Sequence, residues 1–267
     1  MALNGKVAVV TGGGQGLGKG FAECLLQNGA KVSLFDVDEK TGETTKATFE
    51  KEFGTDRVVF CACDVTLEEQ FKDALQKTVE KFGGIDIVCN NAGIINEGNW
   101  EKTVAINLNG VIRGTYLALN HMKKENGGRG GVIINIASLA GLGPFPTCPV
   151  YTATKHGVVG FSRAIAMASA AAGYGVRINI ICPNFVRTAM LGALTSEEQC
   201  GQFFQLQEIN HKLLDSYGVL EVSDVVKAFE SLVLDESQNG AAVSVGAEGF
   251  DYVKFPTAED LKKKSNM

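Results

Sequence analysis

Residues 6–18 read KVAVVTGGGQGLG, an apolar run followed by a turn that contains five glycines. A short apolar run that ends at glycine is typical of a buried strand. Glycines let the backbone turn tightly, and a helix beginning near Gln15 would direct its N-terminal amides into the turn, where they attract negative charge. A glycine-rich turn alone could also be a flexible loop. Its place between a strand and a helix predicts a phosphate-binding turn in an open α/β sheet.

The same alternation of short apolar runs and longer helical segments continues along the chain. Continuous apolar runs predict strands that are covered on both faces, as in a parallel sheet. Right-handed crossovers between them give a doubly wound sheet with a crevice at its switch point. Because no linker or repeat divides residues 1–267, we predict one α/β domain with a seven-stranded parallel sheet, a Rossmann fold. The predicted strands are Lys6–Val10, Val32–Asp36, Val58–Cys63, Ile85–Asn90, Val132–Ile136, Arg177–Cys182 and Ala242–Val245.

The segment Met190–Gly218 follows the sixth predicted strand and is too long for an ordinary connection. Apolar residues are spaced among polar ones throughout it. This pattern fits either short amphipathic helices that close over a pocket or an ordinary pair of packing helices. We predict the first, a substrate lid at about residues 190–218, because the substrate inferred below is apolar.

Composition excludes several classes of protein. The formal net charge of −5 argues against nucleic acid or an anionic membrane surface as the main partner. No run of about eighteen apolar residues predicts a membrane span, and the N-terminus lacks the apolar stretch of a signal peptide. The seven cysteines include no Cys-x-x-Cys pair. We therefore predict reduced thiols, no metal site and a cytoplasmic protein.

Asp36 ends the second predicted strand, at the spacing from the glycine turn where an acid can accept hydrogen bonds from both ribose hydroxyls of a dinucleotide. A 2′-phosphate would meet like charge there, and neither Val37 nor Gln15 supplies a cation. The sequence therefore predicts NAD rather than NADP. The alternative role for Asp36 is a cap on the next helix. Asp64 ends the third strand similarly and either meets the adenine edge or caps the helix before Leu67.

Tyr151-Thr-Ala-Thr-Lys155 places a phenol and an ammonium one helical turn apart, on one helix face. We expect the ammonium to lower the pKa of Tyr151 toward the working pH, because it favours the phenolate. A phenolate can take the hydroxyl proton of an alcohol while a hydride leaves the same carbon for a nicotinamide. Ser138, after the fifth predicted strand, can donate to the developing oxyanion. Chance can produce Tyr-x-x-x-Lys; its position after Ser138 makes the pattern specific.

From residue 6 to about 188 the chain resembles the short-chain dehydrogenase/reductase family. The resemblance rests on 11–18, Asn90-Asn91-Ala92-Gly93, Asn107, Ser138 and the Tyr151/Lys155 pair. It implies that Asn107 anchors a water in a proton relay from Lys155, as a fourth catalytic residue, and that Asn91, Val186 and Thr188 contact the cofactor. The full expected cofactor-binding set is Gly12, Gln15, Gly16, Leu17, Gly18, Asp36, Val37, Cys63, Asp64, Val65, Asn91, Tyr151, Lys155, Val186 and Thr188.

A narrower resemblance rests on the segments 99–103, 126–128, 138–142, 149–151, 155–157, 185–186 and 217–218. They are similar to a branch of that family whose members oxidise the 15-hydroxyl group of prostaglandins to a ketone with NAD. This resemblance implies that Phe185 and Tyr217 line the pocket of an apolar hydroxy-lipid, with Ser138 and Tyr151 at the reacting group. Cys148 stands where that branch carries a Gln that bonds the reacting hydroxyl. We therefore expect Cys148 in the substrate site and expect its alkylation to reduce turnover.

Two alternatives remain from the sequence. One is a dehydrogenase of another apolar alcohol, such as a terpenoid, retinoid or steroid, which the departure at Cys148 leaves open. The other is a non-catalytic NAD-binding or lipid-binding protein on the same fold. The family resemblance also implies a homodimer through the helices predicted around 104–124 and 151–172.

Overall fold

The computed structural model describes residues 2–256 and contains one eight-stranded sheet in the order β3-β2-β1-β4-β5-β6-β7-β8. Its first seven strands are parallel, which confirms the predicted sheet. The order reverses between β1 and β4, where a doubly wound sheet opens its crevice. The parallel strands are β1 Val7–Thr11, β2 Lys31–Asp36, β3 Val58–Ala62, β4 Ile87–Asn90, β5 Gly131–Ile136, β6 Val176–Pro183 and β7 Ala242–Gly246.

The eighth strand is a correction to the predicted count of seven. β8, Gly249–Tyr252, turns back after two residues and pairs antiparallel with β7 at the edge of the sheet. Its residues, GFDY, are exposed or half-buried. An edge strand of this kind carries no apolar run, so the pattern that identified the buried strands could not indicate it.

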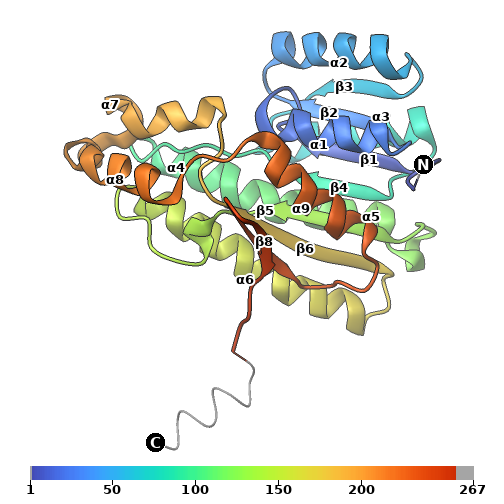
Figure 1. Ribbon diagram of the computed structural model, residues 1–267. Coiled ribbons are helices and arrows are strands. Elements are labelled where there is room, and N and C mark those ends of the chain that lie inside the picture. The colour runs from blue at the N-terminus through green and yellow to red at the C-terminus, as the bar shows by residue number, and fades with distance from the viewer. Residues whose placement is uncertain (1, 257–267) are drawn as a thin grey trace, which may run out of the picture.

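Helices cover both faces of the sheet (Figure 1). On one face α1 and α9 pack together, and the rings of Phe21 and Phe229 stack with centroids 4.4 Å apart. On the other face α3, α5 and α6 contribute Phe71, Leu119 and Ala166 to a second apolar cluster. The helices are α1 Gly16–Gln27, α2 Glu39–Phe53, α3 Glu68–Phe82, α4 Trp100–Val104, α5 Val111–Met122, α6 Pro149–Ala171, α7 Glu197–Cys200, α8 Gln207–Tyr217 and α9 Val222–Leu234.

The helix predicted around 104–124 is interrupted. A π-helical turn, η1 Ala105–Gly110, joins α4 to α5. Such a turn accommodates an extra residue within a helix and is frequent at functional sites. Apolar spacing of three and four residues does not reveal it, because helical segments lie on both sides of the turn.

The segment between Val186 and Leu220, which contains the residues predicted to form a lid and is called the lid segment, or lid, below, leaves and rejoins the fold at one place. Val186 and Leu220 form an isolated parallel β-bridge. Its two backbone hydrogen bonds run from Arg187 N to Leu220 O and from Leu220 N to Phe185 O. Between these ends lie the 3₁₀ turns η4 Ala189–Thr195 and η5 Gly201–Leu206, together with α7 and α8. In the view of Figure 1, α7 and α8 lie at the end of the molecule opposite the N-terminus.

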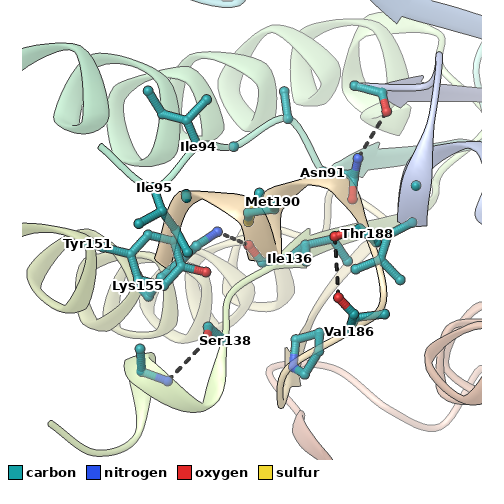
Figure 2. Close-up of a pocket in the computed structure, with 18 of the residues that line it drawn as sticks. Asn91, Ile94, Ile95, Ile136, Ser138, Tyr151, Lys155, Val186, Thr188 and Met190 are labelled. Carbon is teal, nitrogen blue, oxygen red and sulfur yellow. Dashed lines mark hydrogen bonds between the residues drawn. The ribbon is translucent and has the colours of Figure 1, made fainter. Parts of the chain in front are cut away.

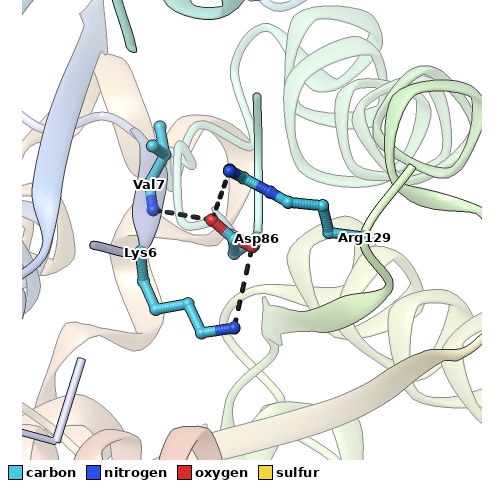
Figure 3. A network of polar contacts seen from close by, with 4 residues as sticks. All are labelled: Lys6, Val7, Asp86 and Arg129. Carbon is cyan, nitrogen blue, oxygen red and sulfur yellow. Dashed lines mark hydrogen bonds and ion pairs between the residues drawn. The ribbon is translucent and has the colours of Figure 1, made fainter. Parts of the chain in front are cut away.

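At the amino end of the central strands, Asp86 joins three segments (Figure 3). Its carboxylate accepts from the amide of Val7 at 2.9 Å and from Nη2 of Arg129 at 2.7 Å. Lys6 Nζ lies 3.8 Å from the other carboxylate oxygen. Because Asp86 is buried and precedes β4, this network fixes the start of β1 against β4 and the loop before β5.

None of the helices within residues 2–256 combines the length and apolar character needed to cross a lipid bilayer.

Candidate active site

A cavity of about 650 Å³ lies at the carboxyl ends of the parallel strands, beneath the lid. A volume of this size suits a small-molecule site, and the position is the one expected for a ligand of a doubly wound sheet. Most of the residues predicted from the sequence line it: Gly12, Gln15, Gly16, Leu17, Asp36, Val37, Cys63, Asp64, Val65, Asn91, Ser138, Tyr151, Lys155, Phe185, Val186, Thr188 and Tyr217. Gly18, Asn107 and Cys148 are the predicted residues outside the lining.

The glycine turn is held close to the loop after β4. Gly12 has a φ of +63°, and a Cβ there would stand 3.0 Å from Cα of Ala92. Asn91 Nδ2 donates to Thr11 O at 2.9 Å and to Gly12 O at 3.2 Å, which fixes the turn (Figure 2). A Cβ on Gly18 would stand 2.0 Å from Gly12 O, so Gly18 allows α1 to pack against the turn rather than lining the cavity.

The N-terminus of α1 faces the cavity without a capping side chain. Gln15 occupies the N-cap position and its side chain makes no capping hydrogen bond. The first amides of a helix have no partner within the helix and carry partial positive charge. An anionic group of a ligand can therefore bind at this turn.

Asp36 lies beside the turn, at the end of β2. Its Oδ2 accepts from Gly14 N at 2.9 Å, and its Oδ1 accepts from Asp38 N at 3.1 Å. The alternative role as a helix cap is wrong, because Asp38 caps α2 by accepting from Thr41 N. Asp36 therefore keeps a carboxylate at the edge of the cavity.

Asp64 likewise does not cap the following helix with its side chain. The N-cap of α3 is Leu67, and Asp64 Oδ1 instead accepts from the amide and hydroxyl of Thr66, at 2.9 and 2.7 Å. Asp64 stays in the cavity lining, next to Cys63 and Val65.

Ser138, Tyr151 and Lys155 gather around the middle of the cavity (Figure 2). Ser138 follows β5, and its hydroxyl accepts from Ala140 N at 3.1 Å. Tyr151 and Lys155 are buried, one turn apart on α6. Lys155 Nζ donates to Ile136 O at 2.9 Å, which ties α6 to the end of β5.

Burial decides the pKa values of this pair. It lowers the pKa of Lys155 to about 8 and raises the pKa of Tyr151 to about 12, with the Ser138 hydroxyl acting in the opposite direction on Tyr151. The expected lowering of the Tyr151 pKa by the ammonium is therefore wrong for the protein without ligand. The reason is desolvation, which disfavours the charged form of each group and is the largest cause of both shifts.

Asn107 lies in the π-helical turn, fully buried. Its Oδ1 accepts from Ile94 N at 2.9 Å and its Nδ2 donates to Ile94 O at 2.8 Å. Both polar atoms of the amide thus hold the backbone N–H and C=O of one residue, Ile94, in the loop after β4, a loop that lines the cavity. This contact gives Asn107 a role in loop geometry that the sequence did not indicate.

Cys148 is fully buried in an apolar cluster with Phe145, Tyr151 and Leu194. Burial raises the pKa of its thiol to about 12. The structure does not bring Cys148 to the cavity, and a thiol of this kind is closed to alkylation. The expectation of a hydrogen bond from Cys148 to a substrate hydroxyl finds no support in this position.

Comparison with known proteins identifies the family. The family model described as short chain dehydrogenase matches residues 6–199. The chain belongs to the short-chain dehydrogenase family. Rat (Rattus norvegicus) 15-hydroxyprostaglandin dehydrogenase [NAD(+)] is 45% identical over 261 residues, covering 96% of this chain and 98% of the relative. The human (Homo sapiens) protein of that name is 46% identical over 258 residues, covering 96% and 97%.

Solved structures agree with this membership. Levodione reductase superposes with a TM-score of 0.79 at 31% identity, over 91% of this chain and 97% of that one. A short-chain dehydrogenase/reductase from Burkholderia phymatum, solved in complex with NAD, gives a TM-score of 0.76 at 28% identity and covers 87% of each chain.

In this short-chain dehydrogenase the lid supplies much of the apolar lining. Phe185 packs edge-to-face against Phe145 with ring centroids 5.8 Å apart. The lid residues in the lining are Met190, Leu191, Ala193, Leu194, Gln199, Leu213 and Tyr217. Side chains that face a cavity favour the lid over an ordinary pair of packing helices.

Several lining residues were not predicted from the sequence, among them Ile94, Ile95, Lys102 and Phe145. They lie in loops and on a short helix, where no periodicity distinguishes a side chain that lines a cavity from one that packs in the core. No group of three His, Cys, Asp or Glu side chains within residues 2–256 is arranged to bind a metal ion.

Proposed function

We propose that this short-chain dehydrogenase oxidises the secondary hydroxyl group of an apolar lipid of the prostaglandin class to a ketone, with NAD as the hydride acceptor. The observation that carries the proposal is the presence of Ser138, Tyr151 and Lys155 in one cavity whose remaining lining is mostly apolar. The names of relatives that are about 45% identical over almost their whole length support the substrate class.

The residues at the glycine turn fit NAD. The uncapped N-terminus of α1 and the backbone of Gly12 and Gly16 leave room and partial positive charge for a pyrophosphate. Asp36 offers a carboxylate for a ribose and would repel a 2′-phosphate. Val186 and Thr188, which also line the cavity, would hold the nicotinamide end. The relatives carry NAD(+) in their names, in agreement with the prediction from Asp36.

The proton path can be derived from the residues. NAD, when held at the glycine turn, would supply the acceptor for the hydride that leaves the alcohol carbon. The phenol oxygen of Tyr151, once deprotonated, would take the hydroxyl proton, and the Ser138 hydroxyl would donate to the substrate oxygen and orient it. Lys155, buried beside Tyr151, would stabilise the phenolate. Asn107 would keep the loop at Ile94 in place next to this site.

Phe185 and Tyr217 would contact the lipid chain, and burial of that chain under the lid would supply most of the binding free energy. The second candidate substrate is another apolar alcohol, such as a terpenoid, retinoid or steroid. The position of Cys148 supports this second candidate. Cys148 is buried away from the cavity, so it offers no hydrogen bond that would select a prostaglandin hydroxyl over another alcohol. A non-catalytic binding protein is disfavoured, since Ser138, Tyr151 and Lys155 are all retained.

The test is NADH formation across a panel of prostaglandin, terpenoid, retinoid and steroid alcohols, with NAD and with NADP. We expect prostaglandin E2 with NAD to give a kcat/KM equal to that of the best substrate. Turnover confined to another class would replace the proposed substrate, and no turnover of any alcohol would favour the non-catalytic alternative. Tyr151→Phe serves as the inactive control in each arm.

The homodimer and the cytoplasmic location stay proposals. Tyr116 on α5 and Met167 on α6 are exposed on the helices expected at the interface. Size-exclusion chromatography with light scattering tests the dimer. All seven cysteines are free, which is consistent with a reducing compartment; cell fractionation tests the location.

A further inference from the structure

The first turn of α6 is capped by a carboxylate from a different part of the chain. Pro149 has no amide hydrogen, so Val150 and Tyr151 carry the two free amides of the turn. Both donate to Glu97: Val150 N to Oε2 at 3.1 Å and Tyr151 N to Oε1 at 2.9 Å. The next amide, of Thr152, donates to Cys148 O. Glu97 therefore satisfies every free amide at the start of the helix that carries Tyr151.

No local residue could replace this cap. Cys148 occupies the N-cap position and makes no capping hydrogen bond. Glu97 is only 9% exposed, and within residues 2–256 it forms no ion pair. A buried carboxylate needs compensation, and here two charge-assisted hydrogen bonds and the positive end of the α6 dipole supply it. The contact is therefore strong for its size and sensitive to loss of the charge.

The same loop also binds the lid. The amide of Glu97 donates to Gln199 O at 2.7 Å, and that of Gly98 donates to the same oxygen at 3.4 Å. A Cβ on Gly98 would stand 2.3 Å from Glu198 O, and a Cβ on Gly201 would stand 3.1 Å from Gly98 Cα. The backbones of the loop and of α7 thus approach as closely as glycine allows. Gln199 itself lines the cavity.

We propose that Glu97 is a positioning residue that sets the orientation of Tyr151 and couples it to the lid. Its side chain holds the first turn of α6 while its backbone holds α7, so one residue connects the cover of the cavity to the phenol inside it. The catalytic part of this inference rests on the proposed role of Tyr151 as proton acceptor.

The test compares Glu97→Ala and Glu97→Gln with a matched control, Asp224→Ala. Asp224 also places a carboxylate on a helix N-terminus, accepting from Glu221 N at the start of α9, but it does not line the cavity. Each variant is assayed with NAD and whichever alcohol the wild type oxidises fastest. Binding of NAD and hydrogen exchange of residues 197–217 in the NAD-bound protein are measured alongside.

For Glu97→Ala we expect kcat to fall about 10- to 100-fold, because a shift of about 1 Å at a reacting group costs that much. The Kd for NAD should stay within twofold, and exchange across the lid should accelerate at least about tenfold. Glu97→Gln retains an oxygen that can accept a hydrogen bond from one of the two amides. Its kcat should therefore fall only about 3- to 10-fold. Asp224→Ala should leave both kcat and lid exchange within twofold of wild type.

A kcat within twofold of wild type for Glu97→Ala, or unchanged lid exchange, would overturn the inference. So would equal losses in Glu97→Ala and Asp224→Ala, since these would reflect general destabilisation. If Glu97→Ala does not fold, Glu97→Gln decides, and full activity with wild-type lid exchange counts against the role. Tyr151→Phe distinguishes failure of the proposed function from failure of this inference. If Tyr151→Phe turns over normally, Tyr151 is not the proton acceptor. Hydrogen exchange of residues 197–217 in the Glu97 variants then still tests whether Glu97 is coupled to the lid.

Discussion

The ammonium nitrogen of Lys155 lies 5.5 Å from the centroid of the Tyr151 ring, and it donates to the main-chain oxygen of Ile136. Both side chains are buried, so neither charged form is well solvated. The pKa of Lys155 falls to about 8 and that of Tyr151 rises to about 12, both through burial. Because the two groups are neighbours, we expect them to titrate as a pair that loses its first proton at the lower value.

Alcohol oxidation should therefore depend on pH through the pair. The pair must lose one proton before it can accept one from the alcohol, so kcat should rise with pH through an apparent pKa near 8 and level off above it. The measurement is a profile of kcat from about pH 6 to 10 at saturating NAD and alcohol. A flat profile, or a rise centred near the pKa of free tyrosine, would contradict the coupled pair.

Replacing Lys155 by Met should abolish oxidation and stabilise the fold at neutral pH. The folded-state pKa of Lys155 is about 8 against 10.5 in the unfolded chain, so folding disfavours the ammonium below pH 8 by about 3 kcal/mol. That penalty disappears as pH rises from 8 to 10.5. Urea unfolding should show Lys155→Met more stable than wild type at pH 7, with a difference that narrows toward pH 10.5. A constant difference would exclude the titration of Lys155 as its cause.

Tyr151→Phe removes the proton acceptor and keeps the ring. We expect kcat to fall by about 10²- to 10⁴-fold, the usual contribution of a general base. Binding of NAD, measured by calorimetry, should change little, because the glycine turn and Asp36 lie at the other end of the cavity. Ser138→Ala is the matched comparison. It removes the hydroxyl that would donate to the substrate oxygen, and its kcat should fall as well. A near-normal rate for Tyr151→Phe would assign proton transfer to another group.

Much of this site could be predicted from the sequence, because many of its polar residues and its glycine turn lie where the parallel strands end. Asp36 ends a buried strand, and Gly12, Asn91 and Ser138 each follow one; the carboxyl ends of parallel strands meet at one edge of the sheet. A strand prediction therefore brings these residues together without any knowledge of side-chain contacts. Tyr151 and Lys155 were predictable for a similar reason, since helical spacing alone places them on one face.

Other features depend on contacts that spacing does not encode. Glu97 reaches the first turn of α6 across more than fifty residues of chain, and nothing in its neighbourhood distinguishes it from a surface acid. Cys148 was expected in the cavity because it stands where the resembling branch carries a Gln that bonds the reacting hydroxyl, yet its side chain lies in an apolar cluster. The direction of the Tyr151 pKa shift was also mispredicted, because desolvation depends on burial by the whole fold.

Asp36→Ala should relax the preference for NAD over NADP. The substitution removes the like charge that a 2′-phosphate would meet, and also the acceptor for Gly14 N. Asp36→Asn is the matched variant, since an amide oxygen can keep the bond to Gly14 without the charge. Both should raise the ratio of kcat/KM for NADP to that for NAD, Asp36→Asn with the smaller loss of NAD activity. An unchanged ratio in both variants would locate the ribose contact elsewhere.

Asp86→Ala should lower stability and leave catalysis intact. The carboxylate is buried and binds the amide of Val7 and the guanidinium of Arg129, whereas Arg129 is half-exposed and can return to water. We expect a loss of about 1–3 kcal/mol in the free energy of unfolding, chiefly from the buried amide left without an acceptor. Arg129→Gln should cost less, because the amide of Val7 keeps its partner. Since Asp86 lies at the amino end of β4 and Asn91 at the other, kcat and the Kd for NAD should match wild type below the unfolding temperature. A change in kcat without a change in stability would mean that the network at Asp86 influences the cavity through the strand.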